Sequence, residues 1–392
     1  MNPGHEFDVL VVGGGLVGAA CALALGQGGL RVGLLESAAP LALPRDDSWD
    51  SRIYAVTPGN VSWLRGMGTW DTLEAARIAP IHRMEVWGDD GHSKLEFDAY
   101  ESGAAELGVI AESRLMLDGL WRQLQACGRV ELLCPARPAA LEIGADAAVL
   151  TLEDGRMLHA KLLVGADGAQ SWVRQQAGIE PLFARDYGQW GVVANFACEK
   201  PHGNVARQWF SKDGILAWLP LPGDRISMVW STPEPHAREL LALEAQALCA
   251  AVAEAGGMAL GALQLLTPAA GFPLKLQYNE SLIRPRLALI GDAAHRVHPL
   301  AGQGVNLGFR DAATLVDTIM ADHGRDPGDW LLLRRYERSR KSDILSMQVV
   351  TDGLQRLFNN DLPGLGTLRN SGLAAVNRSG WLKKQLMAQA MI

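Results

Sequence analysis

The strongest constraint on the fold is a glycine-rich turn between two apolar segments near the N-terminus. Residues 7–12 (FDVLVV) are short, apolar and rich in β-branched side chains, which is typical of a buried parallel strand. The turn GGGLVG at residues 13–18 follows directly, then a small-residue segment of helical character, then a second strand-like segment at 31–36. This order of strand, glycine turn, helix, strand and acid predicts a Rossmann-like dinucleotide-binding unit.

Each glycine of the turn has a separate physical task in such a unit. Gly13 permits the tight turn, Gly15 lets backbone N–H groups approach a pyrophosphate, and Gly18 lets the helix pack closely on the sheet. The phosphates then lie at the positive end of the helix dipole. Glu36 can accept hydrogen bonds from a ribose diol and would repel a 2′-phosphate, so the turn predicts FAD or NAD and not NADP at this site.

Two later segments favour FAD over NAD. Residues 162–174 (LLVGADGAQSWVR) and 287–295 (LALIGDAAH) each run from an apolar strand into glycine and aspartate, at the sheet edge where open α/β folds bind ligands. Asp167 and Asp292 could each hold a ribose or ribityl hydroxyl, and either could instead cap a helix. Their joint occurrence, in this order after the glycine turn, predicts one FAD per chain.

A third glycine-rich segment, HPLAGQGVNLGFRD at residues 298–311, has the properties of a flavin-ring contact. Pro299 fixes a turn, and Gly302 and Gly304 leave bare backbone that can lie against a flat ring. Apolar residues at helical spacing follow from 305 to 319. A helix N-terminus at this place would stabilise the negative charge of reduced flavin.

These motifs together resemble those of the para-hydroxybenzoate hydroxylase-like FAD monooxygenases over almost the whole chain. The segment 298–311 narrows the resemblance to the UbiH/UbiF/VisC hydroxylases of ubiquinone biosynthesis. Residues 50–56 (DSRIYAV) and 112–115 (ESRL) also resemble that group, which implies that Arg52 and Arg114 contact the flavin. The predicted cofactor-binding residues are Gly13, Gly15, Gly18, Glu36, Arg52, Arg114, Asp167, Asp292, Pro299, Gly302, Gln303, Gly304 and Asn306.

The resemblance also implies the reaction and the partners. NAD(P)H would reduce FAD, O2 would add to it, and a C4a-hydroperoxyflavin would hydroxylate a lipophilic, polyprenylated phenol. Contacts with other ubiquinone-biosynthesis proteins are left open. The sequence identifies no catalytic residue of the protein, and His295 and His298 are interpreted as orienting the turn. Two alternative functions are consistent with the same flavin motifs. The protein could be a hydroxylase of another aromatic metabolite, or a non-catalytic flavoprotein scaffold in the assembly of quinone-biosynthesis proteins.

The fold class predicted is α/β, with the FAD-binding domain interleaved with an antiparallel β-sheet substrate domain. The FAD-binding domain is assigned to residues 1–72, 105–180 and 280–325, the substrate domain to 73–104 and 181–279, and C-terminal helices to 326–392. Residues 235–254 are expected to form one helix on the substrate-domain sheet, and 330–357 another long helix. Trp209, Phe210, Trp218 and Trp230 are interpreted as sheet core, with pocket walls as the alternative.

Composition excludes several other classes of protein. The net charge of −7 argues against nucleic-acid binding, and the five scattered cysteines form neither a metal site nor a CxxC pair. An odd cysteine count and no basic N-terminal segment favour a cytoplasmic protein. Beyond Asp361 the chain is basic and apolar without acids, so either a packed terminal helix or a peripheral contact with the inner membrane is expected there.

Overall fold

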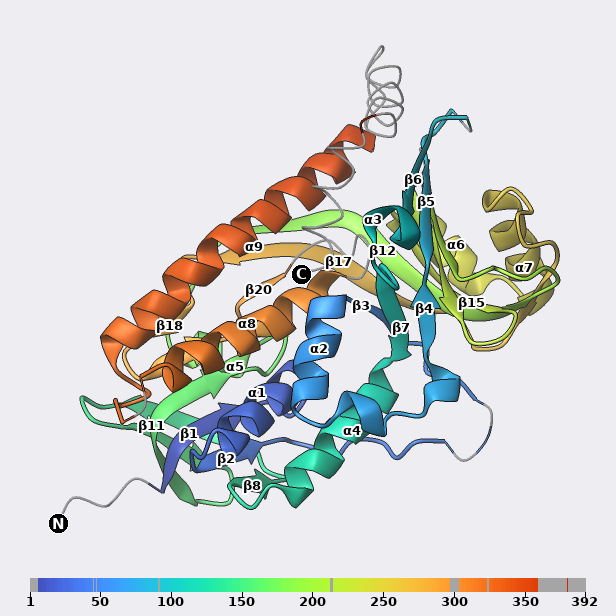
Figure 1. Ribbon diagram of the computed structural model, residues 1–392. Coiled ribbons are helices and arrows are strands. Elements are labelled where there is room, and N and C mark those ends of the chain that lie inside the picture. The colour runs from blue at the N-terminus through green and yellow to red at the C-terminus, as the bar shows by residue number, and fades with distance from the viewer. Residues whose placement is uncertain are drawn as a thin grey trace.

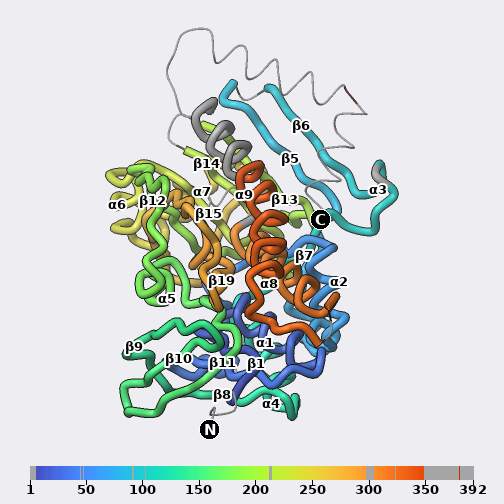
Figure 2. Tube along the Cα trace, turned by 90° about the vertical axis from the view of Figure 1, so that its left-hand side faces the viewer, coloured from blue at the N-terminus to red at the C-terminus, as the bar shows by residue number. Residues whose placement is uncertain are grey.

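The computed structural model describes residues 6–44, 46, 48–90, 92–211, 214–296, 303–322, 324–358 and 379. Three sheets organise these residues, and the two larger sheets occupy opposite ends of the molecule. Figure 2 shows the parallel strands with α1 and α4 at one end and the hairpin of β5 and β6 at the other. Within the described part of the chain, no helix is long and apolar enough to cross a membrane.

The first sheet contains the strands that the glycine motifs follow. Its parallel strands lie in the order β19, β11, β1, β2, β8, so β1 is central, with Val9 opposite both Val32 and Leu162. β1 lies between two parallel strands and is buried at every position except Asp8, which explains its almost continuous apolar sequence. The strands are β1 (Phe7–Val12), β2 (Val32–Leu35), β8 (Val130–Leu133), β9 (Pro138–Ile143), β10 (Ala148–Leu152), β11 (Met157–Gly165), β18 (Ile283–Arg284) and β19 (Leu287–Leu289).

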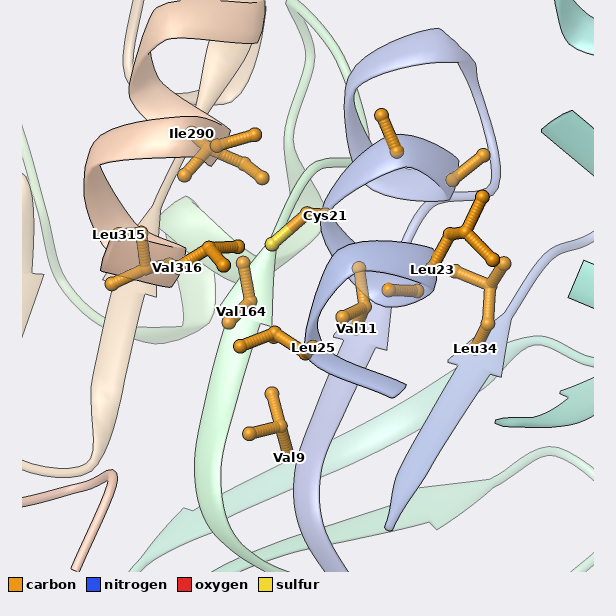
Figure 3. Packing of buried hydrophobic residues seen from close by; sticks show 14 of the residues in the cluster. Val9, Val11, Cys21, Leu23, Leu25, Leu34, Val164, Ile290, Leu315 and Val316 are labelled. Carbon is orange, nitrogen blue, oxygen red and sulfur yellow. The ribbon is translucent and has the colours of Figure 1, made fainter. Parts of the chain in front are cut away.

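Helix α1 (Leu16–Gln27) lies on this sheet between α4 (Ser113–Ala126) and α8 (Gln303–Met320). Its residues are apolar on nearly all sides because sheet and helices surround it. Figure 3 shows Cys21 and Leu25 of α1 beside Val164 of β11 and Val316 of α8. The long helix predicted at 330–357 is present as α9 (Trp330–Phe358), and it packs on α8. The prediction for the C-terminal segment beyond residue 358 concerns residues outside the described ones, apart from 379.

The second sheet is largely antiparallel, in the order β20, β17, β12, β15, β14, β13, β5, β6, with β16 also paired to β12. A third, three-stranded sheet has the order β3, β7, β4. The strands of the second sheet are β5 (Arg83–Trp87), β6 (Lys94–Asp98), β12 (Pro181–Cys198), β13 (Val205–Ser211), β14 (Gly214–Leu221), β15 (Arg225–Pro233), β16 (Leu263–Leu265), β17 (Ala270–Asn279) and β20 (His295–Arg296). Those of the third are β3 (Ile53–Val56), β4 (Ala79–Ile81) and β7 (Gly108–Glu112).

The prediction of one helix over residues 235–254 is wrong. The structure has two helices, α6 (Glu234–Ala242) and α7 (Ala245–Ala255), because Leu243 and Glu244 adopt extended backbone. Both helices cover the second sheet on the side away from α1 and the parallel sheet (Figure 1). The break lets each helix turn its own apolar side to the sheet.

Short elements complete the described chain. They are α2 (Pro58–Gly66), α3 (Ala99–Ser102), α5 (Trp172–Gln176) and the 3-10 turns η1 (Trp70–Thr72), η2 (Ala75–Arg77) and η3 (Gly291–Ala293). The mixed α/β class with interleaved sheets is confirmed, since the strands of the first sheet come from chain segments on both sides of the second-sheet strands β12 to β17. The residue boundaries assigned to the domains stay a prediction.

Candidate FAD site

The three glycines of the first turn have three different environments. Gly13 has φ +107°, and a Cβ there would lie 2.4 Å from the Ala166 carbonyl oxygen. A Cβ on Gly18 would lie 1.9 Å from the Gly13 carbonyl oxygen, so helix and turn are in direct backbone contact. A Cβ on Gly15 would meet nothing within 4 Å. Gly13 and Gly18 therefore shape the turn, while Gly15 faces open space at the N-terminus of α1, as a pyrophosphate requires.

Glu36 is held at the rim of this turn. Its Oε2 accepts a hydrogen bond from the Gly14 N–H at 2.6 Å, and its Oε1 accepts from the Ser37 N–H at 2.7 Å. The indole Nε1 of Trp121 donates to the Gly14 carbonyl at 2.9 Å. The carboxylate is thus fixed directly beside the glycine turn, where its contact with a ribose is proposed.

Asp167 acts as a cap on α5 in this structure. Its Oδ1 accepts from the Ser171 hydroxyl at 2.5 Å and its Oδ2 from the Val173 N–H at 3.0 Å. Ser171 itself accepts from the Arg174 N–H at 2.9 Å. The capping interpretation of Asp167 therefore has direct geometric support, and its contact with FAD stays a prediction.

Asp292 has a different setting at the carboxyl end of β19. Asp292 is exposed to solvent in the turn that follows β19. Partial burial by the neighbouring protein raises the pKa of Asp292, Asp311 raises it further, and the charges of His295 and Arg296 offset only part of the rise. A carboxylate in this position would gain from hydrogen-bond donors such as the hydroxyls of a ribityl chain.

Asp50, to which the sequence assigned no role, holds the two predicted flavin arginines together. Its Oδ1 accepts from the Arg52 N–H at 3.0 Å and its Oδ2 from the Arg114 N–H at 3.1 Å. The Ser113 N–H donates to the Arg52 carbonyl at 2.9 Å, and the Asp50 N–H donates to Glu112 at 2.7 Å. One aspartate thus joins the β3 entry to the N-terminus of α4. Its place two residues before Arg52 was the only sequence signal for this role.

Tyr54 of β3 is influenced by charges from both halves of the site. Burial is the main cause that raises the pKa of its phenol, the carboxylates of Asp292 and Asp50 raise it further, and Arg52 opposes them. Tyr54 was not predicted as a site residue, and a lone tyrosine within a strand offers no sequence pattern that would single it out.

The predicted contact Asn306 is buried and already has several partners. Its Oδ1 accepts from the Thr57 N–H and from Asn60 Nδ2, both at 2.9 Å, and its Nδ2 donates to the Ala55 carbonyl at 2.7 Å. These bonds tie the β3–α2 connection to the start of α8. Asn306 therefore supports the site's framework, and a direct contact with FAD stays a prediction.

The remaining residues of this segment are only partly described. Pro299, Gly302 and His298 lie outside the described residues, and Gln303 is described only as the first residue of α8. A Cβ on Gly304, in the first turn of α8, would meet none of the described residues within 4 Å, as is also the case for Gly15. His295 is buried, and its Nε2 lies 2.6 Å from Asp311 Oδ2, which agrees with an orienting role.

The aromatic residues of the second sheet belong to its core. Trp218 and Trp230 pack with α6 and α7, partly buried Trp209 packs against that cluster, and Phe210 belongs to a small cluster with β5 and β6. Strand alternation places the partly exposed Ala217 and Val229 on the opposite face. Among the described residues, no group of three or more His, Cys, Asp or Glu could hold a metal ion.

A family model described as an FAD binding domain matches residues 6–350. The chain belongs to this family. It is 38% identical over 387 residues to the 3-demethoxyubiquinol 3-hydroxylase of Escherichia coli (strain K12), covering 98% of each chain. It is 36% identical to the mitochondrial ubiquinone biosynthesis monooxygenase COQ6 of Mus musculus, covering 98% of this chain and 90% of that protein.

A solved structure, pqsL, a probable FAD-dependent monooxygenase from Pseudomonas aeruginosa, superposes with a TM-score of 0.77 at 25% identity, over 94% of this chain and 99% of that one. The chain is accordingly an FAD-dependent monooxygenase, with FAD as cofactor and NAD(P)H as the co-substrate typical of these enzymes. The residues fit FAD, because no described residue lies within 4 Å of a Cβ on Gly15 or Gly304, and the exposed Asp292 can accept hydrogen bonds from a ligand.

Proposed function

We propose that this enzyme hydroxylates the ring of a lipophilic, polyprenylated phenol in ubiquinone biosynthesis, and that the predicted residues form its FAD site. The relatives named for ubiquinone hydroxylation match the chain over almost its whole length, which is the observation that carries the proposal. When bound, FAD reduced by NAD(P)H supplies the activation of O2 from which one oxygen atom enters the ring.

The protein's own part is to bind and orient the cofactor and to keep the ring's surroundings apolar. Gly15 leaves room for the pyrophosphate at the N-terminus of α1, and Asp292 accepts hydrogen bonds from the ribityl hydroxyls. Arg52 and Arg114, fixed through Asp50, provide positive charge close to the flavin ring. The face of the second sheet that carries Ala217 and Val229 would provide an apolar wall for the substrate.

Labelled oxygen tests the reaction. The holoenzyme is given NAD(P)H, a prenylated phenol and isotopically labelled O2, and the product is analysed by mass spectrometry. We expect one labelled oxygen atom in the ring of the product. Label entering from water would exclude the monooxygenase reaction, and NAD(P)H oxidation that never yields a ring-hydroxylated prenylphenol would exclude this substrate class. Peripheral membrane contact through the basic C-terminal segment is a further part of the proposal, and co-sedimentation with anionic vesicles tests it.

A further inference from the structure

We propose that Asp311 of α8 and Arg340 of α9 are positioning residues for the FAD-binding loop of residues 291–295. In this proposal the long helix α9 is part of the cofactor site, although it lies outside the predicted FAD-binding segments. The inference rests on the proposed contact between Asp292 and FAD.

Asp311 holds both ends of that loop with one oxygen atom. Its Oδ2 accepts from the Gly291 N–H at 2.9 Å and lies 2.6 Å from His295 Nε2. Gly291, with φ +60°, begins the loop, and His295 ends it at β20. Asp292 lies between these two anchors with its carboxyl group open to solvent. The position of Asp292 therefore depends on where Asp311 holds the loop.

His295 and Arg340 together keep Asp311 charged in the interior. Asp311 is completely buried, and its Oδ1 accepts from Arg340 Nε at 2.8 Å. Burial alone would raise the pKa of Asp311, but the charges and hydrogen bonds of His295 and Arg340 outweigh it and lower that pKa. An ionised Asp311 accepts stronger hydrogen bonds from Gly291 and His295 than a neutral one would.

Two further side chains of α9, Tyr336 and Glu337, attach this helix to the first sheet near the 291–295 loop. The Tyr336 hydroxyl donates to the Leu289 carbonyl at 2.8 Å, at the end of β19. Glu337 Oε1 accepts from the Leu282 N–H at 3.0 Å and from the Ser281 hydroxyl at 2.6 Å, beside β18. One side of α9 thus follows β18 and β19, and β19 ends at Leu289, two residues before Gly291. Arg340 continues that side one turn further on.

The experiment compares substitutions of Arg340 and Glu337, two buried polar residues that both attach α9 to the rest of the protein, in the full-length enzyme. Arg340→Met removes the charge opposite Asp311 and keeps a similar side-chain length. Glu337→Ala removes a similarly buried α9 anchor that does not contact the 291–295 loop. For each variant, FAD affinity is measured by titration of flavin fluorescence, and the unfolding temperature by scanning calorimetry. Arg340→Lys keeps the charge, and Arg338→Ala is the exposed control on α9.

We expect Arg340→Met to weaken FAD binding at least about tenfold and Arg340→Lys to restore much of it. Glu337→Ala should lower the unfolding temperature comparably but change FAD affinity less than about threefold. Arg340→Met should weaken FAD binding by a smaller factor when Asp292→Ala is already present, because both changes act on the proposed contact between Asp292 and FAD.

Two results would overturn the inference. One is that Arg340→Met and Glu337→Ala weaken FAD binding equally for equal losses of stability, which would make Arg340 a general core residue. The other is that the effects of Arg340→Met and Asp292→Ala multiply independently. If Asp292→Ala alone leaves FAD affinity unchanged, the proposed site fails together with this inference, whereas the labelled-oxygen experiment tests the reaction separately.

Discussion

Gly15 and Gly18, in the same glycine-rich turn, are required for different reasons. Gly15 has ordinary φ of −68° and open space where a Cβ would lie, whereas a Cβ on Gly18 would overlap a backbone oxygen. We expect Gly15→Ala to cost less than about 1 kcal/mol of stability but to weaken FAD binding at least about tenfold, because its methyl group occupies the pyrophosphate's approach. Gly18→Ala should cost about 1–3 kcal/mol in the apoprotein itself.

Chemical denaturation of the apoprotein and FAD titration separate the two effects. The pyrophosphate assignment would be wrong if Gly15→Ala bound FAD as tightly as the unchanged protein.

Within the helix α8, one glycine likewise has free space where a Cβ would lie and another is in close contact with a neighbouring side chain. A Cβ on Gly304 would meet nothing within 4 Å, whereas a Cβ on Gly308, one turn later, would lie 2.6 Å from Val17 Cγ2. We expect Gly304→Val to leave the apoprotein as stable as before, or slightly more so, since valine forms helix better than glycine. It should nevertheless weaken or distort FAD binding. Gly308→Val should destabilise the apoprotein by about 1–3 kcal/mol.

Circular dichroism melts and the absorption spectrum of bound flavin measure these outcomes. An unchanged flavin spectrum and affinity in Gly304→Val would mean that the first turn of α8 does not face the cofactor.

The attachment of α9 should depend on pH. Burial alone would raise the pKa values of Asp311 and Glu337, but hydrogen bonds and neighbouring cations lower both below their ordinary values. Their contribution to stability is therefore complete above the ordinary carboxyl pKa of about 4 and is lost as pH falls through the lowered folded-state values. Asp292, whose pKa is raised, has the opposite sign: its contribution is complete below its unfolded pKa and is lost as pH rises through its folded pKa.

Urea midpoints of the apoprotein between about pH 7 and pH 3 test this prediction. The loss of stability as the pH falls should be smaller in Asp311→Asn, because this variant has no carboxylate to protonate at position 311. An equally steep loss in that variant would show that Asp311 does not contribute to it.

Trp49 connects the sheets at the scale of the whole molecule. Its ring lies under the guanidinium groups of Arg77, at 4.6 Å, and of Arg225 of β15, at 5.7 Å, and it packs against a cluster that includes residues of both the second and third sheets. Arg77 also pairs with buried Glu112 of β7 at 2.6 Å. Because Trp49 precedes Asp50, this contact helps to hold Asp50, which accepts hydrogen bonds from the backbone N–H groups of Arg52 and Arg114.

We expect Trp49→Ala to cost about 1–2 kcal/mol and to speed hydrogen exchange at Asp50 and Arg52, with weaker FAD binding. Trp49→Phe keeps a ring between the two arginines and should change exchange much less. Equal exchange in the alanine variant and the unchanged protein would show that the loop is held without Trp49.

Elements with a local cause could be predicted from the order of the amino acids alone. A β-branched run, a glycine that must adopt φ +107° and a helical repeat each depend on neighbours within a few residues, so β1, the first turn and α9 are where they were predicted. The prediction of a single helix at 235–254 is wrong because the helical spacing of apolar residues continues across Leu243 and Glu244, and that spacing does not reveal their extended backbone.

The pairing of buried polar groups could not be predicted in this way, because it depends on how distant segments pack. Asn306 finds Thr57 across 249 positions of the chain, and Asp311 finds Arg340 on a different helix. Periodicity shows that a side chain is buried but not which element covers it. For the same reason the sequence left the tryptophans of the second sheet open between core and pocket wall, and the packing of α6 and α7 placed Trp218 and Trp230 in the core. A buried charge is stable only beside its partner, and the fold, by bringing distant segments together, determines that partner.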